Sequence, residues 1–525
     1  MNTFGFLNRV TYGPKPNEIL ALEKIGWEAW VSNQLTPNQN DPIIDALIKS
    51  MELKGTFYLN DREVKRNFRF ERYFYSAQEL WATIRNKDTP DQFYIQLPFR
   101  ESICLTWLRA VHSQWQLKEM IVEFWHNHFN VSAEADDFIQ LMFPIYDREV
   151  IRKHCFGNFR NLLEAVAKSP CMLYYLDNVY SKASPANENY ARELFELHTL
   201  GAQHYFNDLY DEWRKVPGAW EEEAVGYIDE DVYEAARAFT GWTVANGEEF
   251  EGVTLPNTGE FYYYDQWHDH YQKRVLGKEF KSHRAPMEDG HKVLDLVAYH
   301  PGTAKHVCTK LCTWLVADQP PKRIVDEAVS TWIKYQHSEQ QIAKTINVIL
   351  LSDEFKDSLG SKIKRPNHLA LSLIRQLGAK FKPDEVFFWG LQQMGFHQFT
   401  WALPTGHPDD ANYWLTSDMM LKRWNAMPLL LFSEFDDNID MVNFQLTEQM
   451  PDELNTLDAY IDFWYQKLNG KAIEQPTKEQ LALIFKQELQ GYPVHKFRAE
   501  YPKEFDYKLR QLVSMIAIAP SFQKR

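Results

Sequence analysis

Two histidines one residue apart, in the stretch Trp-His-Asn-His-Phe at residues 125–129, are the first groups in this chain that could do chemistry. On a helix, side chains at i and i+2 point about 200° apart, so His126 and His128 would face different neighbours unless the chain bends at Asn127. Neutral imidazole is a ligand for Zn, Fe, Cu or Ni. Alternatively, each ring hydrogen-bonds a backbone or carboxylate partner and holds a helix crossing. The pair alone leaves both interpretations open.

A second polar group lies in the stretch NENYARELFELHTLG. Glu188, Arg192 and Glu196 follow one another at i, i+4 spacing, and Glu193 lies beside them on a helix that is otherwise apolar. A solvated ladder of ion pairs is one interpretation, worth only tenths of a kcal/mol per pair. We favour a buried polar network, because unpaired groups there would cost several kcal/mol. Its carboxylates could bind a metal, and His198 adds an imidazole.

The stretch WHDHYQKRVLG, which follows the aromatic run FYYYDQW, supplies a third group. A His-Asp pair on a loop, here His268 and Asp269, can bind a metal, or the aspartate can orient a neighbouring histidine. A turn cap is an equally good interpretation. Together the three stretches predict a site for a divalent metal ion (Zn, Fe or Mn). Its predicted ligands are His126, His128, Glu188, Glu193, His198, His268 and Asp269. Glu196 is predicted as the general base, and Arg192 as the group that neutralises an anionic substrate.

Helical periodicity dominates the rest of the chain, for example in SICLTWLRAVHSQWQLKEMIVEFW and TAKHVCTKLCTWLVA. Alternation typical of strands is short and local, in EEFEGVTL and GEFYYY, and predicts a β-hairpin or small sheet. We therefore predict a mainly α protein in which residues 1–525 form one large helical domain. The polar segments 205–228 and 433–457 are predicted to be surface excursions.

Composition excludes several classes of protein. The 525 residues are 45% hydrophobic and 25% charged, with a net charge of −15. No basic stripe indicates a nucleic-acid partner. No run approaches 18 apolar residues, so no membrane span is expected. The five cysteines form no CxxC pair and are expected to be free thiols, mostly buried. The beginning of the sequence is unlike a signal peptide, which predicts a cytoplasmic protein as written, or an exported one if a leader has been removed.

The order of these stretches resembles the bacterial family DUF1800, named for a domain of unknown function. The resemblance runs from LNRVTYGPKPNEI through FWHNHF, NENYARELFELHTLG, HDHYQKRVLG, HPGTAKHVCTKL and KRPNHLALSLIRQLG to PTGHPDDANYWL and APSFQKR. Members of that family are often encoded beside a sulfatase-like protein. The resemblance therefore suggests a sulfatase-like partner and a carbohydrate or sulfated substrate, by association only.

Three functions remain from the sequence. The leading hypothesis is a metal-dependent hydrolase whose site lies between the WHNHF helix, the NENYARE helix and the His268–Asp269 loop. The second is an oxidoreductase that holds Fe or Cu with the same residues. The third is a scaffold or binding partner without catalytic activity, in which the polar residues form a buried structural network.

Overall fold

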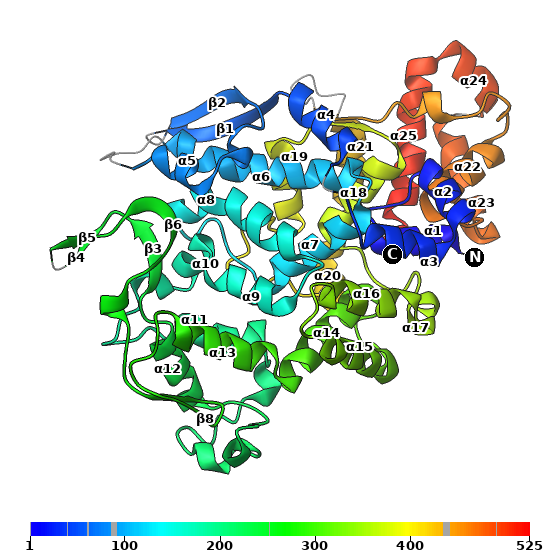
Figure 1. The fold of residues 1–525 in the computed structure, drawn as a ribbon. Helices are drawn as coiled ribbons and strands as arrows, with labels where there is room; N and C mark the ends of the chain where they lie inside the picture. Colours follow the sequence, from blue (N-terminus) through cyan, green and yellow to red (C-terminus); the bar gives the residue numbers. More distant parts are fainter. Residues whose placement is uncertain are drawn as a thin grey trace.

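Apolar residues at helical spacing form helices along nearly the whole chain, so the predicted mainly α fold is confirmed (Figure 1). The structure is a computed structural model and describes residues 2–38, 40–59, 62–85, 92–250, 252–433, 441–489 and 491–525. The helices of the first third are α1 (Thr3–Val10), α2 (Pro16–Ile25), α3 (Trp27–Gln34), α4 (Pro42–Ser50), α5 (Ala77–Ala82), α6 (Gln92–His112), α7 (Gln116–His128), α8 (Asp137–Ile145), α9 (Phe159–Ala167) and α10 (Pro170–Tyr175).

The remaining helices continue this pattern to the end of the sequence. Those of the middle are α11 (Asn189–Glu193), α12 (Asp229–Ala238), α13 (Glu288–Ala298), α14 (Pro301–Leu315), α15 (Lys322–Lys334), α16 (Gln341–Leu351) and α17 (Asp353–Asp357). Those of the last part are α18 (Pro366–Gln376), α19 (Glu385–Gln393), α20 (Ala411–Trp414), α21 (Ser417–Phe432), α22 (Leu457–Asn469), α23 (Gln475–Glu488), α24 (Val494–Glu500) and α25 (Pro502–Ile518). Two π-helical turns, η2 (Tyr146–Arg152) and η4 (Leu194–His198), follow α8 and α11 directly.

Strands form only two-stranded antiparallel sheets within the described residues. The pairs are β1 (Leu53–Leu59) with β2 (Arg62–Phe68), β3 (Trp242–Asn246) with β6 (Asn257–Tyr263), β4 (Glu249–Phe250) with β5 (Val253–Thr254), β7 (Lys273–Val275) with β8 (Lys278–Phe280), and β9 (Lys380–Phe381) with β10 (Val442–Asn443). EEFEGVTL therefore folds back on itself as β4–β5, whereas GEFYYY belongs to β6 and pairs with β3. The short sheet was predicted, but the pairing of its strands was not.

The two predicted excursions differ from each other. Residues 205–228 contain only 3-10 turns and are closed at their base by a bridge between Tyr205 and Tyr227. Of the second segment, residues 434–440 lie outside the described residues. In its remainder Met441, Val442 and Phe444 are buried, whereas Pro451, Asp452 and Glu453 are exposed.

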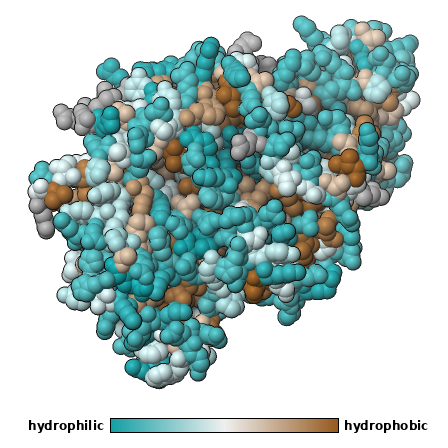
Figure 2. All heavy atoms as spheres, in the orientation of Figure 1, coloured by the Kyte–Doolittle hydropathy of each residue, from teal (hydrophilic) through white to brown (hydrophobic). Residues whose placement is uncertain are grey.

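One continuous hydrophobic core connects the helices, and seven tryptophans are among its fully buried side chains. All five cysteines are free and buried, as predicted. The surface in view is largely hydrophilic with scattered apolar side chains (Figure 2). None of the described helices is both long and apolar enough to cross a bilayer.

The two ends of the chain lie side by side (Figure 1). The Asn8 side-chain amide donates to the Lys524 carbonyl at 3.2 Å, and the Arg525 backbone N–H donates to the Lys362 carbonyl at 2.8 Å. Residues from α1, from the segment before α18 and from the last turn of the sequence thus reach the same part of the molecule. The polar groups described next depend on this closure.

Candidate active site

The helix α7 runs straight through the WHNHF stretch, so its two histidines face different neighbours. The Nε2 atom of His126 lies 2.8 Å from a carboxylate oxygen of Asp147, and Nε2 of His128 lies 3.1 Å from the backbone carbonyl of His198. Asn127 bonds the backbone of His407 with both ends of its amide, at 2.7 and 3.0 Å. The helical interpretation of the pair is therefore correct, and the two rings do not converge.

Both histidines contact a π-helical turn. Asp147 lies in η2, and His198 is the last residue of η4. π turns are rare and occur frequently at functional sites, because the widened turn shifts the side chains that follow it. The regular i, i+4 spacing of the sequence gave no sign of either turn.

His126 belongs to a buried ion-pair network. Asp147 accepts hydrogen bonds from Tyr73 Oη at 2.7 Å and from Arg152 Nε at 2.8 Å, and Arg152 also pairs with both carboxylate oxygens of Glu119. Burial alone would raise the pKa of Asp147, but Arg152 and His126 hold it well below its usual range. Burial lowers the pKa of His126 itself. His126 therefore connects α7 to η2 through Asp147, as expected if this histidine has a structural role.

His128, His198 and His306 form a second group, here named the imidazole cluster. The ring centroid of His128 lies 6.3 Å from that of His198 and 6.2 Å from that of His306. His306 Nε2 lies 3.2 Å from the Leu197 carbonyl, which joins α14 to η4. Among the described residues, Nδ1 of His128 and both ring nitrogens of His198 have no hydrogen-bond partner.

Burial lowers the pKa of all three imidazoles, to about 3 for His198 and about 4 for His306, so the rings are neutral at pH 7. The Nε2–H of His128 donates to a backbone carbonyl, which leaves the Nδ1 lone pair of that ring unused. Metal-binding histidines commonly show this pattern of one nitrogen held by the backbone and one free.

The stripe on the NENYARE helix is half exposed. Arg192 pairs with Glu188 at 3.3 Å and with Asp229 at 3.1 Å, and the exposed fractions of the Arg192 and Glu188 side chains are 36% and 44%. Glu193 and Glu196 are half-buried, and burial and the charge of Glu196 raise the pKa of Glu193. The expectation of a buried network is therefore wrong for these residues, because α11 presents its polar stripe to solvent and turns Tyr190 and Ala191 inward.

The predicted pair of the third stretch, His268 and Asp269, lies in a group of charged side chains that pair with one another. His268 bonds the Thr240 carbonyl at 2.9 Å through Nδ1 and Asp289 at 3.3 Å through Nε2. Asp269 takes two hydrogen bonds from Arg237, at 2.8 and 3.1 Å, and Lys273 Nζ donates to Asp289 at 2.8 Å. We name these residues, His268, Asp269, Lys273, Asp289 and Arg237, the His268 cluster.

The structure thus divides the seven predicted ligands among separate groups, and only His128 and His198 contact each other directly. Within the described residues, no three His, Cys, Asp or Glu side chains are arranged so that they could hold a metal ion. A metal at this protein's site stays a prediction.

A larger polar group surrounds Glu123, which lies one turn before His126 on α7. One carboxylate oxygen of Glu123 accepts hydrogen bonds from Tyr12, from Asn367 at 3.0 Å and from His368 at 2.9 Å. The other has no hydrogen bond and lies 3.7 Å from Arg365 Nη1. Burial alone would raise the pKa of Glu123, but His368, Arg365 and Tyr12 hold it well below its usual range, so it is ionised.

Three buried or partly buried cations beside Glu123 are incompletely paired. The guanidinium groups of Arg365 and Arg525 lie 4.6 and 4.7 Å from the centroid of the Trp314 ring, and the Nε of each lacks a partner in the described part of the chain. The side chain of Lys310, one helical turn before Trp314 on α14, makes no hydrogen bond or ion pair with any described residue, and the charges of Asp409 and Arg365 act on it. The Glu123 cluster comprises Tyr12, Glu123, Lys310, Arg365, Asn367, His368, Asp409 and Arg525.

Lys310 connects the Glu123 cluster with the imidazole cluster. Burial lowers the pKa of Lys310 to about 8, with Arg365 lowering it further and Asp409 opposing the shift. Its charge in turn lowers the pKa of His128, His198 and His306. An amino group whose pKa lies near neutral pH, between a carboxylate network and three neutral imidazoles, can accept and return a proton.

The loop TGHPDD is pressed against α7 and positions Asp409. Gly406 has a φ of +70°, and a Cβ added there would lie 2.2 Å from the Asn127 carbonyl, so only glycine fits. Asp409 lies 3.4 Å from Lys362 and 3.7 Å from Arg365. Asn127 was predicted only as a place where the helix could bend, whereas it anchors this loop.

Sequence reasoning did not select the Glu123 cluster. One signal was present: Tyr12, Lys310, Arg365, Asp409 and Arg525 each lie in one of the stretches that carry the family resemblance. Spacing could not reveal that these stretches meet, because they are separated by up to several hundred residues. His300 caps α14, and its Nδ1 accepts from the Gly302 backbone N–H at 2.9 Å.

Comparison with known proteins gives one result. Neither curated proteins nor solved structures include a match to this chain. The model of the family described as "Protein of unknown function (DUF1800)" matches residues 5–524, which include every residue of the Glu123 cluster except Arg525. The resemblance drawn from the sequence is thereby confirmed, and the chain belongs to the DUF1800 family.

Proposed function

We propose that this protein is a hydrolytic enzyme that acts on a substrate with an anionic group, and that its active site is the Glu123 cluster. The observation that carries the proposal is Lys310, a partly buried amino group without a counter-ion in the described structure. Burial lowers the pKa of Lys310 to about 8, so its charged form costs stability at pH 7, and a protein that needed only stability would gain by replacing it. Such groups are typical of functional sites.

The side chains of the cluster divide into two roles. Lys310, with its pKa near 8, takes a proton from the attacking water and returns it to the leaving group. Arg365 and Arg525 bind the anionic group and stabilise the negative charge that develops in the transition state. Glu123 is ionised and holds His368, Asn367 and Tyr12, so it positions Arg365 and is a poor base itself.

Sulfate and phosphate monoesters carry the anionic group that this proposal requires, and a carboxylic ester fits it only where another part of the substrate is anionic. Sulfated carbohydrates are the first natural substrates to test, and a sulfatase-like protein is the first partner, because the family resemblance suggests both. Neither enters the argument for the site, which rests on Lys310 and its neighbours alone.

The test is a panel of chromogenic sulfate, phosphate and carboxylate esters, assayed with the wild type and with Lys310→Met. We expect wild-type turnover of at least one ester, with a rate that rises with pH to a plateau above about pH 8, and a loss of about 10³-fold in Lys310→Met. Arg192→Ala, on the exposed stripe of α11, is the matched control and should retain activity. Equal kcat/KM in Lys310→Met and wild type, or no turnover of any ester, would contradict the proposal.

A metal-dependent hydrolase is the second candidate, favoured by the unused ring nitrogens of the imidazole cluster. In that case His128→Ala and His198→Ala should each lose bound metal, whereas His126→Ala should retain it because Asp147 occupies that ring. Elemental analysis of protein purified without an affinity metal measures this directly. Zn or Mn would support metal-assisted hydrolysis, and Fe or Cu with an absorption band would support the oxidoreductase hypothesis. Equal metal content in all three variants would remove the imidazole cluster as the site.

A further inference from the structure

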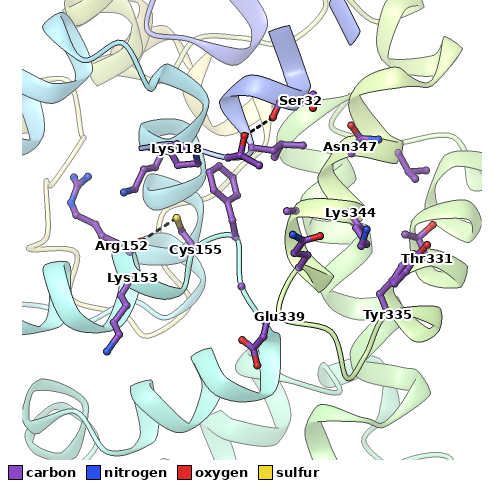
Figure 3. A pocket seen from close by; sticks show the side chains of 18 of the residues that line it. Ser32, Lys118, Arg152, Lys153, Cys155, Thr331, Tyr335, Glu339, Lys344 and Asn347 are labelled. Atoms are coloured by element: carbon purple, nitrogen blue, oxygen red, sulfur yellow. Dashed lines mark hydrogen bonds between the residues drawn. The ribbon is translucent and has the colours of Figure 1, made fainter. Parts of the chain in front are cut away.

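A separate cavity of about 710 Å³ lies on another side of α7. Its walls come from the end of α3, the start of α7, residues 152–157, α15 and α16, as the labelled side chains in Figure 3 show. Residues of the Glu123 cluster and the imidazole cluster do not line it. The volume is within the range of about 300–1,000 Å³ that small-molecule sites occupy.

The cavity is surrounded by lysines that have no counter-ions. Lys118, Lys153, Lys334 and Lys344 line it, and none of them makes a hydrogen bond or ion pair with a described residue. The single acidic residue in the lining is Glu339, whose carboxylate accepts from the Asn161 amide at 3.2 and 3.3 Å. In a chain with a net charge of −15, this is a local reversal of charge.

The remaining walls offer both hydrogen-bonding and apolar contacts. Tyr335 lies between two of the lysines, with Lys344 Nζ 4.8 Å and Lys334 Nζ 5.3 Å from its ring centroid. Thr331 and Asn347 add neutral polar groups from α15 and α16, and Phe156 adds an apolar one. A few convergent polar groups on a partly apolar wall are typical of sites for small organic molecules.

A fifth cation, Arg152, lines the cavity but is already used. Its guanidinium pairs with Asp147 and Glu119, on the side that leads to His126. The four lysines are therefore the groups left to attract a ligand.

We propose that this cavity binds a small polyanionic molecule, one that carries phosphate or sulfate groups, at a site distinct from the Glu123 cluster. Several lysines with no carboxylate partner raise the local concentration of anions, and their amino groups donate charge-assisted hydrogen bonds to phosphate or sulfate oxygens. The cavity is walled by five chain segments, so it admits a compact molecule better than the face of another protein. This inference does not depend on the function proposed for the Glu123 cluster.

Calorimetric titration of the full chain with inorganic pyrophosphate, at low ionic strength, tests the proposal. We expect saturable binding that weakens as salt is added, and a loss of at least about tenfold in affinity in the double variant Lys118→Gln, Lys344→Gln. Lys471→Gln changes an exposed lysine remote from the cavity lining and should bind as the wild type does. Because the cations of the Glu123 cluster can also bind an anion, the two sites are distinguished by which lysines pyrophosphate protects.

Lysine acetylation read by mass spectrometry locates the ligand independently of folding defects in a variant. Pyrophosphate is expected to slow acetylation of Lys118, Lys153, Lys334 and Lys344, and to leave Lys471 unchanged. No binding, binding that the double variant retains, or protection of Lys310 without protection of the cavity lysines would each overturn the proposal.

Discussion

The His268 cluster and the Glu123 cluster contain the same kinds of side chain but pair them differently. In the His268 cluster, Lys273 donates to a carboxylate and two backbone carbonyls, Arg237 is bound by two acids, and His268 uses both ring nitrogens. In the Glu123 cluster, Lys310 has no partner in the described structure, and Arg365 reaches its nearest carboxylates only at 3.7 Å. In the first group every cation is paired, and we call the group saturated in that sense, because Asp289 Oδ1 alone makes no hydrogen bond with a described residue. The second group leaves positive charge unused.

The difference teaches which polar groups serve stability and which are available for a ligand. A saturated network holds the segments it connects, and any ligand would have to break existing bonds. An unsaturated one costs stability in the free protein and can regain it when an anion binds. Both clusters contain residues from stretches that characterise the family, so the sequence alone could not separate them.

The largest expected effect is in the saturated cluster. Lys273→Met removes the shortest ion pair of the buried Asp289 carboxylate and leaves it with His268 at 3.3 Å and Arg284 at 3.5 Å, which should lower the free energy of unfolding by about 3 kcal/mol. Lys278→Met, in the neighbouring strand with an exposed pair, is the control and should change it little. Urea denaturation measures both. A small loss in Lys273→Met would show that the saturated pairing is not what stabilises this region.

Glu123→Gln should destabilise the protein less, by about 2 kcal/mol, because the amide oxygen can still accept hydrogen bonds but no longer offsets Arg365. Glu327→Gln, on the exposed side of α15, is the matched control. If Glu123→Gln proved neutral in a thermal denaturation series, the carboxylate would not be holding the cluster together.

Lys310→Met should have the opposite sign and raise the free energy of unfolding at pH 7 by about 1 kcal/mol or more. The folded-state pKa is about 8 and the ordinary value is 10.5, so between these pH values the unfolded chain binds a proton that the folded chain lacks. Stability of the wild type therefore rises with pH across that window, and the cost of Lys310 is fully present below about pH 8.

The advantage of Lys310→Met over the wild type should accordingly shrink between pH 8 and 10.5. Denaturation of both proteins at a series of pH values measures the difference. A destabilised Lys310→Met, or a difference that does not vary with pH, would mean that Lys310 is paired in solution.

The smallest effect is expected on α11. Arg192→Ala removes two ion pairs whose arginine is 36% exposed, so it should cost less than about 1 kcal/mol, and less still at high salt. A loss of several kcal/mol would instead support the buried polar network that the sequence suggested for this helix.

The fold class and most helices followed from the sequence, because periodicity of 3.6 residues is local. The sequence left open whether His126 and His128 converge, and in the structure they face different neighbours. The site did not follow, for two physical reasons. The π turns η2 and η4 change which side chains face α7, and no spacing rule indicates them. Exposure of the Glu188–Arg192 stripe depends on what packs against α11, which is decided by Tyr190 and Ala191 on its other face.

Residues near both ends of the sequence contact α7 and α18, and these contacts can form only after most of the chain has been synthesised. Glu123 bonds His368 across 245 positions, and Arg525 reaches Met120 across 405. Contacts this remote in sequence form slowly, since the intervening chain must be ordered before they add stability. A growing chain can fold its helices early, but the unpaired cations around Trp314 come together only after residue 525 has been made. The helices should therefore form before Arg365 and Arg525 meet at the Trp314 ring.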